Sequence, residues 1–130
     1  MLVVDASVAV AASVRPEGFG ELGETELVAP PLMWSEARSA LHELMWRAQI
    51  AAGDAETTRA RLEDAPVHRR EPDRLGLVAW QVAEELGWAK TYDAEYVALA
   101  RILGCRLVTI DARLRRGADR LGFVVGPLEL

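Results

Sequence analysis

The sequence predicts an α/β fold, a three-layer α/β/α sandwich with a central parallel sheet. Short apolar runs rich in β-branched residues alternate along the chain with longer segments whose apolar residues recur at helical spacing. Parallel strands need crossover connections, and helices between the strands supply them on both faces of a sheet. The 130 residues contain no repeat and no dividing linker, so a single domain over 1–130 is expected.

The predicted strands are short apolar runs, and the predicted helices are longer amphipathic segments. The strands are expected at Leu2–Val4, Leu27–Ala29, 106–110 and 123–125. The helices are expected at 6–14, 31–52, 54–64, 74–86, 93–103 and 112–121. The segment 17–24 predicts a short helix or a loop, and 66–72 an extended stretch. This pattern does not determine the order of the strands.

Proline, glycine and aspartate mark the expected helix ends. Pro31 suits the first turn of a helix, where its missing N–H is not needed. Gly53 is expected just beyond the end of that helix, and Asp54 is expected to cap the next one. Asp73 has the character of an N-cap, and Gly87 is expected to close the helix that follows.

Composition limits the class of protein. The single cysteine, Cys105, excludes an internal disulfide framework and a cysteine-cluster zinc site, and its apolar surroundings predict a small buried side chain. The apolar N-terminus carries Asp5 and lacks the basic region of a signal peptide. No run approaches the roughly 18 apolar residues that span a bilayer, so the cytoplasm is the default location, with no membrane partner.

The net charge of −5 disfavours simple binding to nucleic acid, because phosphates repel a negative protein. Two interpretations remain: the acids are scattered over the surface, or several of them converge on a cation. Basic residues are concentrated at Arg69 and Arg70 and again between 113 and 120. These stretches are either solvated surface or local contacts for phosphate.

Two aspartates occupy equivalent places in the predicted fold. Asp5 follows Leu2–Val4, and Asp111 follows the predicted strand 106–110, each just before a helix. Ligands of open α/β sheets bind at this carboxyl edge, and the helix dipole favours a carboxylate there. The alternative is that both aspartates only cap helices. Two acids at equivalent strand ends favour a shared site.

Two further acids lie near the starts of predicted helices. Glu36 lies in the first turns of a strongly apolar helix, and Asp93 begins a helix with alanines at Ala94 and Ala98 that indicate close packing. An acid close to a buried surface needs a partner or a metal ion. The alternative for each is an exposed acid paired with a cation.

Four such carboxylates with no lysine or arginine in their own turns cannot all ionise in one pocket without a cation. Hard divalent ions such as Mg²⁺ and Mn²⁺ take carboxylate oxygens and water as ligands. Sites of this kind activate water and stabilise the charge of a cleaved phosphodiester. Periodicity alone does not establish that the four acids converge.

Four motifs, in order along essentially the whole chain, resemble those of PIN-domain proteins of the VapC toxin type. VVDASVAV resembles the first-acid motif, PPLMWSEARSAL the second, TYDAEYVALA the third and LVTIDARL the fourth. Each motif alone is weak, but the four together in this order and length are specific. The matched residues are Asp5, Ser7, Glu36, Asp93, Thr109 and Asp111.

The resemblance implies an endoribonuclease that depends on one or two Mg²⁺ ions, with Mn²⁺ as a possible substitute. By position, Asp5 and Asp93 would be the main metal ligands. Glu36 and Asp111 would hold the metal directly or through water and help to orient the attacking water. Hydroxyls that would support these carboxylates are those of Ser7 and Thr109.

The resemblance also implies partners. VapC-type proteins usually form homodimers, act on RNA and pair with a VapB-type antitoxin, which can place an arginine in the acidic pocket. The segment 52–74 matches no motif, and substrate choice is expected to lie there. The four tryptophans are expected in the core or at a dimer interface rather than in stacking on RNA.

Three other functions are alternatives to this one: a partner-binding module, a phosphoryl-accepting domain and a nucleotide-binding loop. An inactive PIN-like module that only binds a partner is the main alternative, and the intact acidic quartet argues against it. A phosphoryl-accepting domain would need an acid beside Asp5 and a lysine late in the chain, whereas Ala6 follows Asp5 and Lys90 is the only lysine. Neither GxGxxG nor GxxxxGK[ST] occurs, which sets nucleotide-loop proteins aside.

Overall fold

Five short parallel strands form the central sheet, in a computed structural model that describes all residues, 1–130. Their order across the sheet is β3-β2-β1-β4-β5, and each neighbouring pair is parallel. The strands are β1 Leu2–Val4, β2 Leu27–Ala29, β3 Val67–Arg69, β4 Arg106–Val108 and β5 Val124–Val125. The central position of β1, with every residue buried, confirms the expectation for the N-terminal run.

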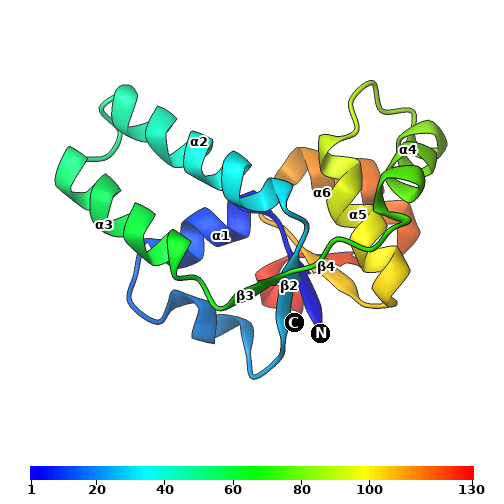
Figure 1. Cartoon of the computed structure of the whole chain (residues 1–130), viewed down its shortest axis with the longest axis horizontal. Helices are drawn as coiled ribbons and strands as arrows, with labels where there is room; N and C mark the ends of the chain where they lie inside the picture. Colours follow the sequence, from blue (N-terminus) through cyan, green and yellow to red (C-terminus); the bar gives the residue numbers. More distant parts are fainter.

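Helices cover both faces of this sheet, which confirms the predicted three-layer arrangement. Figure 1 shows α1, α2 and α3 on one side of the strands and α4, α5 and α6 on the other. α2 and α3 run side by side and project away from the sheet (Figure 1). The helices are α1 Ala6–Ser13, α2 Leu32–Trp46, α3 Ala52–Glu63, α4 Leu75–Leu86, α5 Tyr92–Leu103 and α6 Ala112–Ala118. Short 3-10 helices are η1 Gly18–Leu22, η2 Asp119–Leu121 and η3 Pro127–Glu129.

α5 is packed against the sheet, as its alanines predict. Ala94, Ala98 and Ala100 have no exposed surface, and the helix contacts β1, β4 and α4. Small side chains let the backbone of this helix approach the strands closely. The start of α5 is therefore held at the carboxyl edge of the sheet, where β1 and β4 also end.

The prediction of one helix over 31–52 is wrong at its C-terminal end. α2 ends at Trp46, and the backbone N–H groups of Ala48 and Gln49 donate to the carbonyls of Met45 and Leu44. This is the hydrogen-bond pattern of a Schellman motif, with Ala48 in the left-handed conformation that glycine usually supplies. Gly53, expected beyond the helix end, instead lies inside α3.

Two predicted helix caps are also wrong. Ala51 occupies the N-cap of α3, and Asp54 lies within the first turn, where the helix dipole still favours its charge. Arg74 occupies the N-cap of α4 in place of Asp73, and no side chain caps that helix. Gly87 closes α4 in the left-handed conformation, as predicted.

The strand boundaries differ at the sheet edges. The extended stretch 66–72 contains β3, which pairs only with β2 and forms one edge of the sheet. β4 ends at Val108 rather than at 110, because the chain turns there toward α6. β5 begins one residue later than predicted, and residues 119–121 form η2 instead of continuing α6. α5 begins at Tyr92, one residue before Asp93.

The tryptophans divide between core and surface. Trp34 belongs to the hydrophobic core, and Trp88 packs against it. Trp46 at the end of α2 is 81% exposed, and Trp80 on α4 is also exposed. The core expectation therefore holds for two of the four. Cys105 is partly buried against the same core. No helix combines the length with the hydropathy that crossing a bilayer would require.

Candidate active site

Asp5 and Asp111 cap two helices that follow neighbouring strands. Asp5 comes directly after β1, and its side chain accepts a hydrogen bond from the backbone N–H of Val8 at 3.0 Å. Asp111 follows β4 and accepts from the N–H groups of Arg113 and Leu114 at 2.9 and 3.3 Å. Since β1 and β4 are adjacent and parallel, both carboxylates lie at one edge of the sheet. Both aspartates are therefore helix caps and also neighbours.

Asp5 is too deeply buried for an ordinary surface cap. Only 3% of the residue is exposed, and two hydroxyls donate to its carboxylate. The Ser7 hydroxyl donates to Oδ1 at 2.6 Å, and the Thr109 hydroxyl donates to Oδ2 at 2.5 Å. Oγ of Ser7 also accepts from the N–H of Ile110, and Oγ1 of Thr109 from the N–H of Asp111. These bonds tie the end of β1 to the turn after β4.

Glu36 is brought to the site by α2, which lies in the same layer as α1 and across the sheet from α5 and α6 (Figure 1). It lies in the second turn of α2, half-buried, and its Oε1 accepts from the hydroxyl of Tyr96 at 2.6 Å. Tyr96 lies on α5, and only 1% of it is exposed. Sequence reasoning missed Tyr96. A signal for it existed, because it follows Asp93 by three residues and so shares its helix face.

The pKa values of three of these acids are affected by the charges of the others. Burial raises the pKa values of Asp5, Glu36 and Asp93, and the neighbouring carboxylates raise them further. Asp111 acts on both Asp5 and Asp93, while Asp93 and Asp5 act on Glu36. Hydrogen bonds from Ser7, Thr109 and Tyr96 and the positive charge of Arg113 oppose these shifts in part.

None of the four acids forms an ion pair. The molecule's ion pairs all involve other carboxylates, on its surface. Arg113 lies in the first turn of the helix that Asp111 caps and lowers the pKa of Asp93, which corrects the expectation that no lysine or arginine lies in the turns of the four acids. Its guanidinium nevertheless makes no ion pair with that carboxylate. The negative charge of the site is therefore left without a direct partner.

The donor chemistry of the site fits a hard divalent cation, although its side chains do not yet form a ligand set. No group of three or more His, Cys, Asp or Glu side chains is close enough together to hold a metal ion. Both oxygens of Asp5 already accept hydroxyl hydrogen bonds. Unpaired carboxylates that raise one another's pKa are the oxygen donors that Mg²⁺ and Mn²⁺ prefer.

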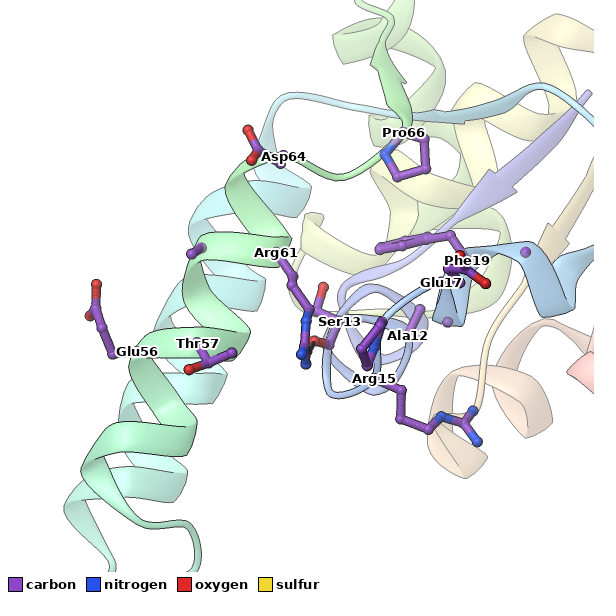
Figure 2. Close-up of a pocket in the computed structure, with 14 residues that line it drawn as sticks. Ala12, Ser13, Arg15, Glu17, Phe19, Glu56, Thr57, Arg61, Asp64 and Pro66 are labelled. Atoms are coloured by element: carbon purple, nitrogen blue, oxygen red, sulfur yellow. Dashed lines mark hydrogen bonds between the residues drawn. The ribbon is translucent and has the colours of Figure 1, made fainter.

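A pocket of about 480 Å³ opens beside two of the acids. Glu36 and Asp93 line it, whereas Asp5 and Asp111 lie outside its lining. A larger pocket, of about 810 Å³, lies away from the acids between the end of α1 and α3. Figure 2 shows Arg61 of α3 reaching toward Ser13 there, and its guanidinium donates to the carbonyls of Ser13 and Val14. None of the four predicted site residues lines the larger pocket.

Fold and site together define a PIN domain. The PIN domain family model matches residues 2–120. The chain belongs to the PIN domain family. Within it, the chain is 37% identical over 115 residues to the VapC ribonuclease Mb0985 of Mycobacterium bovis and to ribonuclease VapC9 of Mycobacterium tuberculosis, with 88% of each chain covered. The resemblance to the VapC type is thereby confirmed.

Solved structures share the fold at lower identity. PAE2754 from Pyrobaculum aerophilum superposes with a TM-score of 0.75 at 23% identity, covering 98% of this chain and 90% of that one. FitAB bound to an IR36 DNA fragment gives a TM-score of 0.66 at 14% identity, covering 100% and 97%. At these identities, the similarity establishes the architecture alone.

Proposed function

We propose that the protein is a Mg²⁺-dependent endoribonuclease and the toxin of a toxin–antitoxin pair, with Mn²⁺ able to replace Mg²⁺. One observation carries the proposal: Asp5 and Asp111 follow adjacent parallel strands, Glu36 and Asp93 line one pocket, and none of the four carboxylates forms an ion pair. The names of the VapC relatives, which describe ribonucleases, support RNA as the substrate.

Each acid is proposed to have a distinct part. Asp5 and Asp93 would be the principal metal ligands, and Glu36 and Asp111 would hold the ion directly or through water. A bound Mg²⁺ would activate water and stabilise the charge on the cleaved phosphodiester. Ser7 and Thr109 would support these carboxylates.

The hydrogen bonds of this chain position the carboxylates. Ser7 and Thr109 hold both oxygens of Asp5, so its carboxylate cannot rotate freely. Tyr96 holds one oxygen of Glu36 and leaves the other free to act as a proton acceptor for the attacking water. Burial raises the pKa of Glu36 above its ordinary value, in the direction of neutral pH, and this suits a group that accepts and releases a proton.

The test compares RNA cleavage with and without metal. Purified protein, freed of antitoxin, would be incubated with total cellular RNA in Mg²⁺, in Mn²⁺ or in EDTA. Discrete cleavage that requires the metal and is lost in Asp5→Asn and Asp93→Asn would support the proposal. Glu43→Gln is the matched control, because Glu43 is an exposed acid of α2 that pairs with Arg47 away from the site.

The same experiment decides the alternative of an inactive partner-binding module. Absence of cleavage in every arm, with calorimetry also showing no divalent ion bound by the folded protein, would favour that module. A VapB-type antitoxin and a homodimer are proposed as partners on the strength of the VapC relationship. Co-expression with a candidate antitoxin and sedimentation analysis of each species would test both partners.

A further inference from the structure

The pocket beside Glu36 and Asp93 also carries cations and aromatic rings. Lys90 and Arg113 line it together with Tyr92 and Trp88. Lys90 and Tyr92 lie around the start of α5, and Arg113 lies in the first turn of α6, so the two cations come from separate elements. A pocket of about 480 Å³ falls within the size range of sites for small ligands.

Both cations are free of other partners. Arginines 15, 38, 47, 59, 101 and 115 all take part in ion pairs. Lys90 and Arg113 are exposed, form no ion pair and donate no side-chain hydrogen bond. They are close to the acids without neutralising them, and their donors remain available for an anionic ligand.

The two aromatic residues have different surroundings. Tyr92 is 57% exposed and directly precedes Asp93. Trp88 is partly buried, and its ring lies against Gly117 of α6, where an added Cβ would stand 3.0 Å from Cζ2 and Nε1 of the indole. Gly117 therefore lets Trp88 pack closely on α6 and form a fixed wall. Tyr92 presents an open ring face on which a base can stack.

We propose that this pocket binds one nucleotide of single-stranded RNA beside the scissile phosphate. Lys90 and Arg113 bind its phosphate, Tyr92 stacks on its base, and Trp88 forms the wall behind. This inference rests on the proposed nuclease function and adds how the substrate is held. It would also explain how a chain of net charge −5 can bind RNA, because two cations without ion-pair partners line the same pocket as two of the acids.

The experiment measures binding of a labelled, random-sequence single-stranded RNA by fluorescence anisotropy in EDTA, so that cleavage does not interfere. Replacing both cations, with Lys90→Gln and Arg113→Gln, is expected to weaken binding roughly tenfold. It should also reduce the slope of log affinity against log salt by about 0.7, because the two cations together neutralise one phosphate of the single strand. Arg116→Gln is the matched control, because Arg116 is an exposed, unpaired arginine of α6 outside the pocket.

The aromatic residues are tested separately from the charges. Tyr92→Ala is expected to weaken binding between about 5- and 150-fold with the salt slope unchanged, and Tyr92→Phe should restore affinity because it keeps the ring. Gly117→Ala should also weaken binding, since the new methyl group displaces the indole of Trp88. Circular dichroism confirms that each variant is folded.

The outcomes separate the two proposals. If the wild-type protein fails to bind RNA, or if the pocket variants behave like Arg116→Gln, the nucleotide pocket is refuted even where metal-dependent cleavage is observed. If the pocket variants lose affinity but the wild-type protein cleaves no RNA with Mg²⁺ or Mn²⁺, the nuclease proposal fails and the binding pocket stands.

Discussion

Replacing Thr109 with valine removes one hydroxyl from the most buried part of the site without changing the shape of the side chain. Thr109 is 2% exposed. Its hydroxyl donates to Oδ2 of Asp5 at 2.5 Å and accepts from the N–H of Asp111 at 3.0 Å. Valine can do neither, so the variant leaves a buried carboxylate with one donor fewer and a backbone N–H without its acceptor.

The expected loss of stability follows from these two contacts. A hydrogen bond to a charged group contributes about 1.5–3 kcal/mol. The N–H of Asp111 adds less, because Asp111 is only partly buried and water can replace the lost acceptor. We expect Thr109→Val to lower the free energy of unfolding by about 2–3 kcal/mol at neutral pH. Thr109→Ser keeps the hydroxyl, loses one buried methyl group and should cost only about 1 kcal/mol.

The cost of Thr109→Val should also depend on pH. Burial raises the pKa of Asp5 above its unfolded value, so near the carboxyl range the folded state binds more protons than the unfolded chain. The contribution of Asp5 to stability is then greatest at low pH and decreases as pH rises through the folded pKa. The Thr109 hydroxyl opposes this pKa shift. The difference between wild type and Thr109→Val should therefore grow across that pH window.

Urea unfolding in EDTA, followed at several pH values, measures both effects. The midpoint should fall with the slope unchanged, as expected for a change in stability alone. The reasoning is refuted if Thr109→Val is as stable as Thr109→Ser at neutral pH, or if its deficit is the same at acidic and neutral pH.

Three further changes follow from the same structure. Asp5→Asn removes a buried charge, so the metal-free protein should melt at a higher temperature at neutral pH, and Mg²⁺, which we expect to stabilise the wild type, should not stabilise this variant in calorimetry. Tyr96→Phe deprives Glu36 of its donor, so kcat for RNA cleavage should fall while RNA affinity in EDTA is unchanged. Ala48→Gly relieves the left-handed conformation at the end of α2 and should raise the unfolding free energy by about 1 kcal/mol, measured with urea.

The sequence was sufficient for the layers of the fold and for placing Asp5 and Asp111 at the carboxyl edge of the sheet, whereas the strand order that makes them neighbours came from the structure. Both predictions depend on local patterns. A strand buried on both faces is a continuous apolar run in the sequence, and an acid that follows such a strand lies at the carboxyl edge of the sheet. The prediction that Glu36 and Asp93 join this edge relied on family resemblance. Nothing local determines that the second turn of α2 and the first turn of α5 meet across the sheet.

The missed features depend on partners distant in the sequence or on unusual residues. β3 is a strand only because β2 pairs with it, and its exposed His68 and Arg69 give no apolar alternation to detect. The end of α2 was missed because the residue that ends the helix in the left-handed conformation is Ala48, whereas glycine is the usual residue there. Tyr96 was missed because its role depends on Glu36, 60 residues earlier in the chain.

Hydroxyl groups rather than cations orient the carboxylates of Asp5 and Glu36, and this has a chemical consequence. An arginine beside Asp5 would orient the carboxylate and also neutralise it, which would remove its attraction for a divalent ion. The hydroxyls of Ser7, Thr109 and Tyr96 orient carboxylates and leave their charge in place. If the site binds a divalent ion as proposed, part of the stability lost to buried, mutually repelling acids would be recovered when the ion binds. It also follows that an arginine delivered by a partner protein could pair with these acids, since none of them forms an ion pair within this chain.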